Sequence, residues 1–223
     1  DWNIVLTPFT PVPHNWFPVK GSKMLGLASG GGQQGPVLAA AGFDVTIFDN
    51  SPAQLEQDKK VSDQFNLGIK TIQGDMADLT VFTNETFDFV FNPCSTCFVP
   101  DVVKVYREVA RVLKPGGIFM TGFTKPVYYL FDIMQVEKGI FTLKYSSPYS
   151  DLESLNDEEL KFFMDQNEPI VFGHSLEAHI NGQLQAGMQL TQIIEDTWGG
   201  DNPVDKYFPA FIASRAVKGH ISF

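Results

Sequence analysis

The chain has little cysteine, few basic residues and no long apolar run. Its two cysteines, Cys94 and Cys97, are too few for a disulfide framework in a chain of 223 residues. Lys and Arg number 16 against 26 Asp and Glu, which gives a net charge of −10. Such a surface repels phosphate backbones and anionic lipids, so we expect neither a nucleic acid nor a membrane as partner. No apolar run approaches the ~18 residues of a membrane span and no leader segment is visible, so we expect a cytoplasmic protein.

The motifs of several enzyme classes are also missing. The sequence contains no H-E-x-x-H, no P-loop and no G-x-S-x-G. His174 and His179 are five residues apart in an expected helix, where they diverge by roughly 140° and cannot share a metal. Cys94-Ser-Thr-Cys97 has two interpretations, a redox or metal pair, or two buried or pocket-lining thiols. We favour the second because a zinc site needs two further ligands, and we expect no metal.

The chain is rich in apolar side chains, which occur in short runs separated by helical segments. Hydrophobic residues make up 43% of the chain and include 20 Phe, enough for a core, and the length suits one domain over 1–223. Strands are expected at 23–28, 44–49, 68–73, 87–92 and 117–123, and helices at 34–41, 52–65 and 101–113. This alternation predicts a doubly wound α/β fold, a parallel sheet with helices on both faces.

Other segments flank this core, 23–123. An arm, 1–22, contains four prolines that interrupt any helix or central strand. Residues 124–171 do not continue the alternation of strands and helices, and we expect them to form an insertion of hairpin and helical pieces. The closing segment, 172–223, contains an expected helix at 174–186 and strands at 190–196 and 210–216, which pair antiparallel because no helix joins them. We expect the arm and the insertion to close as a lid over an acceptor pocket. The alternative for the arm is an ordered terminus without a role in binding.

A glycine-rich loop joins the first strand to the first helix. The loop residues are Ala28, Ser29, Gly30, Gly31, Gly32, Gln33 and Gln34. Glycines let the backbone turn sharply and approach a ligand, and the helix start supplies free N–H groups. The next strand ends at Asp49, whose carboxylate can accept both ribose hydroxyls, so the pattern predicts a nucleotide-type site. Two alternatives remain: Gly30, Gly32 and Gly35 also fit the G-x-G-x-x-G of dinucleotide oxidoreductases, and such a turn can serve packing alone.

Three further motifs narrow the choice of cofactor. The third strand ends in Gln73-Gly74-Asp75-Met76, where Asp75 can accept a hydrogen bond from an adenine amino group. The fourth strand ends in Asn92-Pro93, and Lys114-Pro115-Gly116-Gly117 precedes the fifth. With these motifs the chain resembles the class I S-adenosylmethionine-dependent methyltransferases, particularly the small-molecule type with a single Rossmann-like domain. The resemblance covers about 23–123 and implies the sheet order 3-2-1-4-5-7-6, with strand seven antiparallel.

The resemblance also implies roles for the loop and strand ends. Ala28 to Gly32 would wrap the methionine part of S-adenosylmethionine. The remaining cofactor roles would fall to Asp49 and Asn50 at the ribose, Asp75 and Met76 at the adenine, and Asn92 and Pro93 along the passage from the sulfonium methyl to the acceptor. The family usually has an acid in the first strand, where this chain has Gly26. Gln33 or Gln34 would then take over the contact of that acid.

These features predict methyl transfer to a small-molecule acceptor by direct in-line displacement, which leaves S-adenosylhomocysteine. The candidates on the acceptor side are Cys97, Tyr128 and Tyr129 as lining residues, and His14 and His174 as polar or basic groups. Residues of these types also serve as core, caps or solvated groups. Two other functions stay open: an NAD(P)-dependent oxidoreductase, although the sequence has no Tyr-x-x-x-Lys, and an inactive S-adenosylmethionine-binding protein, because of Gly26. We expect a monomer or a homodimer.

Overall fold

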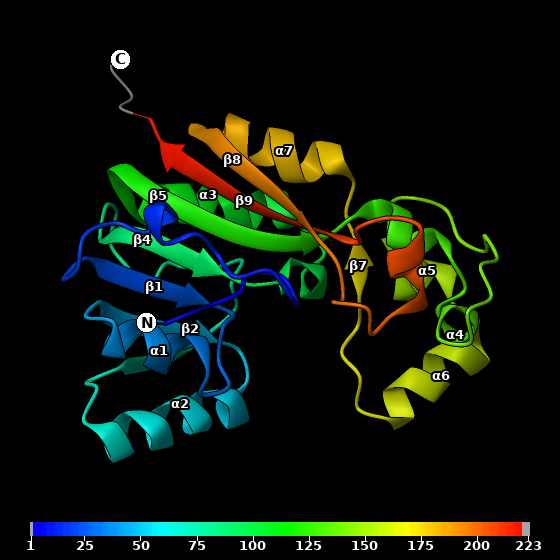
Figure 1. The fold of residues 1–223 in the computed structure, drawn as a ribbon, viewed down its shortest axis with the longest axis horizontal. Coiled ribbons are helices and arrows are strands. Elements are labelled where there is room, and N and C mark those ends of the chain that lie inside the picture. The colour runs from blue at the N-terminus through cyan, green and yellow to red at the C-terminus, as the bar shows by residue number, and fades with distance from the viewer. Residues whose placement is uncertain (1, 220–223) are drawn as a thin grey trace.

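One seven-stranded sheet forms the centre of the molecule. The computed structural model describes residues 2–219, so the first residue of the expected arm and residues 220–223 of the expected closing segment lie outside the described part. The strands are β1 (Lys23–Leu27), β2 (Asp44–Asp49), β3 (Lys70–Gln73), β4 (Phe87–Asn92), β5 (Leu113–Thr124), β8 (Met188–Asp196) and β9 (Phe211–Lys218). Their order is β3-β2-β1-β4-β5-β9-β8, and β9 runs antiparallel to both neighbours (Figure 1). The predicted fold class and strand order are confirmed.

Helices cover both faces of this sheet, as predicted. They are α1 (Gln34–Ala40), α2 (Pro52–Phe65), α3 (Val102–Val112) and α7 (Leu176–Gln185). Successive side chains of a strand point to opposite faces, so each strand contributes to two cores. In β4, Val90 packs in the core that α3 and α7 cover, whereas Phe89 and Phe91 pack in the core shared with α1 and α2. The sheet is therefore buried on both sides, which explains its nearly continuous apolar strands.

Local signals in the sequence set most element boundaries. Ser51 caps α2 and Pro52 occupies its first turn, while Asp101 caps α3 by accepting from the backbone N–H of Lys104 at 3.0 Å. The strand expected at 117–123 instead begins at Leu113, because Leu113 pairs with Phe87 ahead of a bulge. Among residues 2–219, no helix has both the length and the apolar character that a membrane span requires.

The arm lies on a face of the sheet, and its residues Asn3, Ile4 and Val5 line one side of a groove beside α1 and α2. It doubles back on itself through a bridge between Val5 and Pro11. Its buried side chains are Ile4, Leu6, Val12 and Trp16, which join the core on the α1 and α2 side. The expectation of few core contacts is therefore wrong for this segment, because its apolar side chains fill a sheet face that α1 and α2 leave uncovered (Figure 1). Closure of the arm over an acceptor pocket stays a prediction.

The turn of the arm is the part that reaches the carboxyl edge of the sheet. Asp196, the last residue of β8, accepts hydrogen bonds from the Thr7 hydroxyl at 2.7 Å and from the backbone N–H groups of Phe9 at 3.0 Å and Thr10 at 2.9 Å. Burial raises the pKa of Asp196, but the hydrogen bonds from Thr10, Thr7 and Phe9 outweigh it and lower the pKa to about 2. A charged Asp196 thus fixes the turn of the arm.

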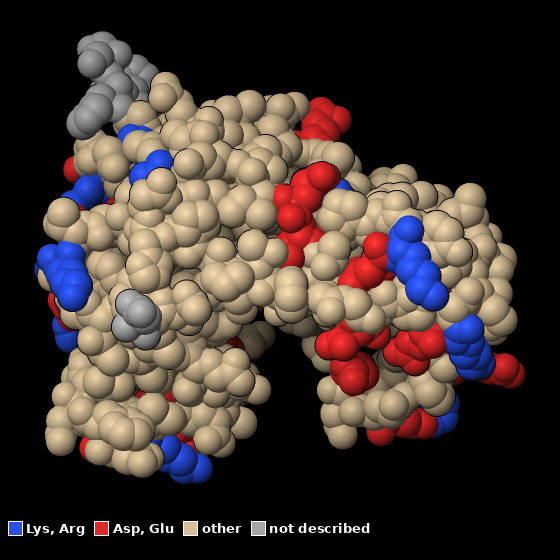
Figure 2. All heavy atoms as spheres, viewed as in Figure 1, with Lys and Arg blue, Asp and Glu red and all other residues tan. Residues whose placement is uncertain are grey.

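Residues 125–173, which we call the insertion lobe, lie beyond the carboxyl ends of the parallel strands (Figure 1). The lobe contains α4 (Ile133–Val136), β6 (Tyr149–Ser150), α5 (Asp151–Ser154), α6 (Asp157–Asp165) and β7 (Phe172–Gly173), and β6 pairs with β7. A small core of Tyr128, Val204, Ala210 and Phe211 joins the lobe to the loop before β9. Figure 2 shows a hollow between the lobe and the part of the molecule that carries α2.

Candidate cofactor and acceptor site

The glycine loop turns at the carboxyl end of β1. Ala28, Gly31 and Gly32 have positive φ angles of 47°, 123° and 73°, a region that glycine reaches without strain. The loop folds against the first turns of α2, where a Cβ on Gly30 would come within 2.8 Å of Cβ of Gln54. Larger residues at Gly30 or Gly32 would push the loop away from α2, so the glycines are required by the geometry of the loop.

Asp49 stands beside this loop at the end of β2. Its Oδ2 accepts from the backbone N–H of Gly30 at 3.0 Å, and its Oδ1 accepts from the backbone N–H of Ser51 at 2.9 Å. Each oxygen of a carboxylate has two acceptor positions, so each retains one for a ligand hydroxyl. The two backbone hydrogen bonds thus fix the orientation of the carboxylate that was expected to hold a ribose.

A second carboxylate, Asp58 of α2, lies under the loop and was missed by the sequence analysis. Asp58 is fully buried, and its Oδ2 accepts from the backbone N–H of Gly31 at 2.9 Å. Burial raises the pKa of Asp58, the loop N–H groups of Gly31 and Gly32 lower it, and the charge of Asp49 raises it again; the net shift is upward. The available signal was an acid in phase with Leu55 and Ser62 on the buried face of α2.

An acid at the strand-one position where the family usually has one would displace the side chains of two neighbouring residues. A Cβ on Gly26 would lie 2.5 Å from Cδ1 of Ile47 and 2.5 Å from Oγ of Ser29. Gln33 and Gln34, which were expected to replace that acid, line a groove of about 750 Å³ between the arm, α1 and α2. Besides Asp49, the acid that contacts the loop is Asp58.

The expected adenine residues follow β3. Asp75 is exposed, and its Oδ1 accepts from the backbone N–H of Ala77 at 2.8 Å. The side chain of Met76 is buried in the core on the α3 side. The backbone carbonyl of Asn50 accepts from Nε2 of Gln73 at 3.2 Å, which ties the end of β2 to the end of β3. The polar groups of both strand ends therefore face the same edge of the sheet.

Asn92, at the end of β4, is fully buried and holds three strands together. Its Nδ2 donates to the Leu27 carbonyl at 2.8 Å and to the Ser95 hydroxyl at 2.7 Å, and its Oδ1 accepts from the Thr121 hydroxyl at 2.9 Å. The side chain has a structural role here, while its neighbour Pro93 is half-buried. Contact of either residue with a cofactor stays a prediction.

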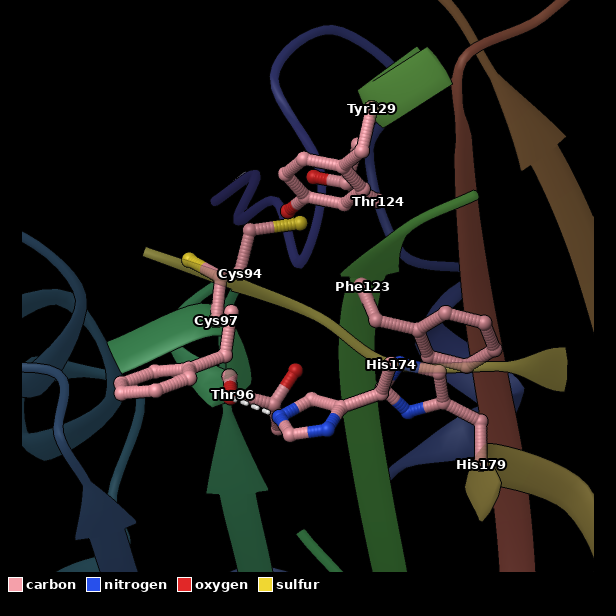
Figure 3. Close-up of a pocket in the computed structure, with 9 residues that line it drawn as sticks. Cys94, Thr96, Cys97, Phe123, Thr124, Tyr129, His174 and His179 are labelled. Atoms are coloured by element: carbon pink, nitrogen blue, oxygen red, sulfur yellow. Dashed lines mark hydrogen bonds between the residues drawn. The ribbon is translucent and has the colours of Figure 1, made fainter. Parts of the chain in front are cut away.

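A cavity of about 10 Å³, the space of one water molecule, lies where the insertion lobe meets the sheet. The residues that line it are Cys94, Thr96, Cys97, Phe123, Thr124, Tyr129, Phe172, His174 and His179 (Figure 3). Both cysteines are free. Burial raises the pKa of Cys97 to about 11 and raises that of Cys94 further, so both are neutral thiols near pH 7. Neither is therefore activated as a nucleophile.

His174, which was expected on the acceptor side, lines this cavity together with His179. Nε2 of His174 lies 2.9 Å from the carbonyl oxygen of Val99 and 3.1 Å from that of Thr96, so Nε2 carries the hydrogen and Nδ1 keeps a lone pair (Figure 3). Burial lowers the pKa of His174, which keeps the ring neutral. His179 stacks on Phe123 with centroids 3.8 Å apart, and burial lowers its pKa to about 3.

His14 lies elsewhere, and its expected place at the acceptor is corrected. The exposed ring of His14 stacks on Trp2 at 4.4 Å, and Trp2 packs edge-on against Phe43, just before the start of β2. This is the amino edge of the sheet, opposite the glycine loop. The arm brings His14 there because its buried side chains fix the arm on the sheet face.

The insertion lobe contains a larger cavity of about 400 Å³. Its aromatic lining consists of Tyr128, Tyr129, Phe131, Tyr145, Tyr149, Phe162 and Phe163. Tyr129 also lines the small cavity that contains Cys97, so one ring forms a wall of both spaces (Figure 3). Two of the residues expected to contact substrate, Tyr128 and Tyr129, thus line the larger cavity. The other rings of the lining could not be assigned to a cavity from the sequence.

Comparisons with known proteins identify the family. Residues 25–121 match the model of the methyltransferase domain. The chain is 47% identical over 219 residues, 98% of this chain and 85% of the relative, to the protein of Bacillus subtilis (strain 168) named uncharacterized methyltransferase YbaJ. The chain belongs to the S-adenosylmethionine-dependent methyltransferases.

More distant relatives agree with this family. The chain is 36% identical to sterol methyltransferase-like 3 of Botryococcus braunii over 115 residues, which are 48% of this chain and 28% of the relative. The crystal structure of an S-adenosylmethionine-dependent methyltransferase from Mesorhizobium loti superposes with a TM-score of 0.69, at 16% identity, over 91% of this chain and 94% of the other. The fold is therefore that of the family, and nothing in the comparisons favours an oxidoreductase.

The residues at the carboxyl edge suit the cofactor of the family, S-adenosylmethionine. Asp49 has a free acceptor position on each oxygen for the ribose hydroxyls, and Asp75 has one oxygen free of protein hydrogen bonds for an adenine amino group. The backbone of Ala28 to Gly32 can follow the methionine part because three of its residues have positive φ. When bound, the cofactor supplies an electrophilic methyl group on a positively charged sulfur.

Proposed function

We propose that the methyltransferase methylates a small molecule that binds in the cavity of the insertion lobe. The observation that carries this proposal is the aromatic cavity of about 400 Å³, which shares Tyr129 with the small cavity at the ends of β4 and β5. A volume of this size suits a small ligand and no macromolecule. The glycine loop, Asp49 and Asp75 would hold the cofactor at the adjoining strand ends. The acceptor would then approach the methyl group from the side of the insertion lobe.

The protein's own part in this reaction is alignment, exclusion of water and removal of a proton. The sulfonium already activates the methyl group, so a direct in-line displacement needs no nucleophile from the protein, in agreement with the neutral thiols of Cys94 and Cys97. Nδ1 of His174 keeps a lone pair, and His174 lines the small cavity. We assign His174 as the group that accepts a proton from the acceptor.

Two assays test this proposal. Calorimetry with S-adenosylmethionine should detect binding, and Asp49→Ala should weaken it by about 1.5–3 kcal/mol, the range for hydrogen bonds to a charged group. Asp44→Ala is the matched control, since Asp44 is an exposed acid at the opposite end of the same strand. Unchanged binding in Asp49→Ala would rule out the proposed ribose contact.

The second assay separates an enzyme from an inactive binding protein. Release of S-adenosylhomocysteine is measured with a panel of small acceptors, for the wild type and for Tyr129→Ala. Turnover that Tyr129→Ala abolishes while cofactor binding persists would support the acceptor cavity. Binding of the cofactor without turnover of any acceptor would favour the inactive protein.

A further inference from the structure

The insertion lobe carries half of the net negative charge of the chain. Residues 125–173 contain nine acidic and four basic side chains, against a net charge of −10 for all 223 residues. Figure 2 shows acidic side chains gathered on the lobe where it borders the hollow. A binding site within this lobe therefore lies in a negative potential, which attracts cations and repels anions.

The larger cavity shares this charge. Three carboxylates, Glu137, Asp151 and Glu168, line it together with the aromatic rings, and no Lys or Arg is among the described residues that line it. The nearby Lys144 pairs with both Asp132, at 3.3 Å, and Glu159. Because two carboxylates offset this one ammonium, the lining stays negative.

The aromatic rings of the cavity wall pack against one another. Tyr129 and Tyr149 are stacked with centroids 5.5 Å apart and an interplanar angle of 15°, and Tyr145 meets Tyr149 edge-on at 5.2 Å. The hydroxyl of Tyr149 donates to Oδ1 of the buried Asp151 at 2.6 Å, while Oδ2 of Asp151 accepts from the backbone N–H of Val171 at 2.7 Å. Asp151 thus fixes the ring of Tyr149 in the wall of the cavity.

One ring of the lining already meets a cation. Nζ of Lys144 lies 5.0 Å from the centroid of the Tyr145 ring. Aromatic faces attract ammonium groups through the ring quadrupole, and the attraction grows when the site excludes water. A cavity lined by aromatic rings and carboxylates therefore favours a ligand with a positively charged nitrogen and an apolar or aromatic body.

We propose that the methyl acceptor is an amine of this kind, bound in the cavity as its ammonium form. The proposal rests on the proposed function, because it names the substrate class of the same site. For the reaction the ammonium releases a proton to water or His174, and its lone pair forms the new N–C bond. The C–S bond breaks with its electron pair left on sulfur, so the sulfonium becomes a neutral thioether and the nitrogen regains the positive charge.

Calorimetry without cofactor tests the charge preference directly. The probes are two sets of matched skeletons: 2-phenylethylamine, 2-phenylethanol and phenylacetate, and tryptamine, tryptophol and indole-3-acetate. In at least one set the amine should bind about tenfold more tightly than the alcohol, and the acid should not bind. The inference is overturned if neither amine binds, if alcohol and amine bind equally, or if an acid binds best.

Charge-neutral variants show whether the cavity is the site. Glu137→Gln with Glu168→Gln should reduce amine affinity about tenfold and leave the affinity for the alcohol unchanged. Both side chains are exposed, so the double variant is expected to fold. Glu153→Gln is the control, because Glu153 is exposed in the same lobe and does not line the cavity. Equal effects of the double variant and the control on amine binding would contradict the proposal.

These readouts are separate from those of the proposed function. If S-adenosylmethionine binds and some acceptor is methylated while the amines fail to bind, the substrate class is wrong and the methyltransferase function stands. If the amines bind as expected and no acceptor is ever methylated, the cavity is an amine site in a protein without turnover.

Discussion

Asp58 is the single residue in which this methyltransferase departs most clearly from the arrangement that its sequence motifs suggest. The side chains of Ile47 and Ser29 occupy the space beside Gly26 that an acid in β1 would need, whereas α2 places the carboxylate of Asp58 against the backbone N–H of Gly31. The family pattern puts this acid in the first strand, so a search of the sequence for that pattern could not identify an acid that a helix supplies. Asp58 therefore serves as the anchor of the glycine loop.

Two substitutions at Asp58 should have opposite effects. Burial raises the pKa of Asp58 above its ordinary value of 3.8. The free energy of unfolding should therefore fall as the pH rises from 3.8 through the raised pKa. Asp58→Asn keeps an acceptor oxygen without the charge, so this variant should lose that pH dependence and be at least as stable as the wild type near neutral pH. Asp58→Ala removes the carboxylate acceptor of the Gly31 N–H, which then keeps only the longer contact to the Gln54 carbonyl at 3.2 Å, and should lower the free energy of unfolding by about 1–3 kcal/mol.

Urea unfolding across the acidic to neutral range measures both effects, and calorimetry measures cofactor affinity. The affinity for S-adenosylmethionine should fall in Asp58→Ala and be largely retained in Asp58→Asn, because only the first frees the loop. Asp63→Asn, an exposed acid in the same helix, is the control. A loss of affinity in Asp58→Asn as large as in Asp58→Ala would mean that the charge matters and not the hydrogen bond.

At the scale of elements, the arm behaves as part of the core. Trp16 is 1% exposed and packs with Ile4, Leu6 and Val12 on the sheet face. A Cβ on Gly122 of β5 would collide with the carbonyl oxygen of Leu6, so the arm backbone lies directly on the strand. Proline spacing predicts an irregular arm but not which face it covers, since the covered face depends on where α1 and α2 stop.

Removal of the Trp16 side chain should therefore destabilise the whole protein. Trp16→Ala should lower the free energy of unfolding by about 3–5 kcal/mol, the usual cost of deleting a large buried aromatic. Phe9→Ala is the control within the same arm, because Phe9 is 61% exposed and should cost far less. Chemical denaturation gives both values. A Trp16→Ala protein of normal stability but impaired turnover would support the idea of the arm as a lid.

The elements that the sequence predicts best are those with both a local signal and a buried apolar run. The expected bounds of β2, β4 and α2 agree with the structure, since Asp44–Asp49 and Phe87–Asn92 are apolar runs and Ser51-Pro52 begins α2. The short elements of the insertion lobe could not be predicted one by one from the sequence, because helices as short as α4 and α5 form only through tertiary contacts. For the same reason the cavity between them could not be predicted from the sequence.

At the scale of the whole molecule, the uneven charge distinguishes the two parts of the site. The glycine loop, Asp49 and Asp58 belong to the sheet domain, where the carboxylates are held by backbone hydrogen bonds. The insertion lobe has nine acidic and four basic side chains, and Glu137 and Glu168 of its cavity are exposed to solvent. Exposed charges are screened by salt much more than buried ones.

Salt should therefore weaken the binding of an amine and leave a neutral isostere almost unaffected. The Debye length falls from about 10 Å at 0.1 M to about 3 Å at 1 M, so added NaCl removes most of the attraction between the lobe and an ammonium group. A charge pair at about 4 Å in high dielectric contributes about 1 kcal/mol, so the loss should be about fivefold in affinity. Calorimetric titration of 2-phenylethylamine at low and high NaCl measures it, with 2-phenylethanol as the control. If both ligands lose affinity equally, the salt acts on the protein fold; if neither does, the negative lobe does not contribute to acceptor binding.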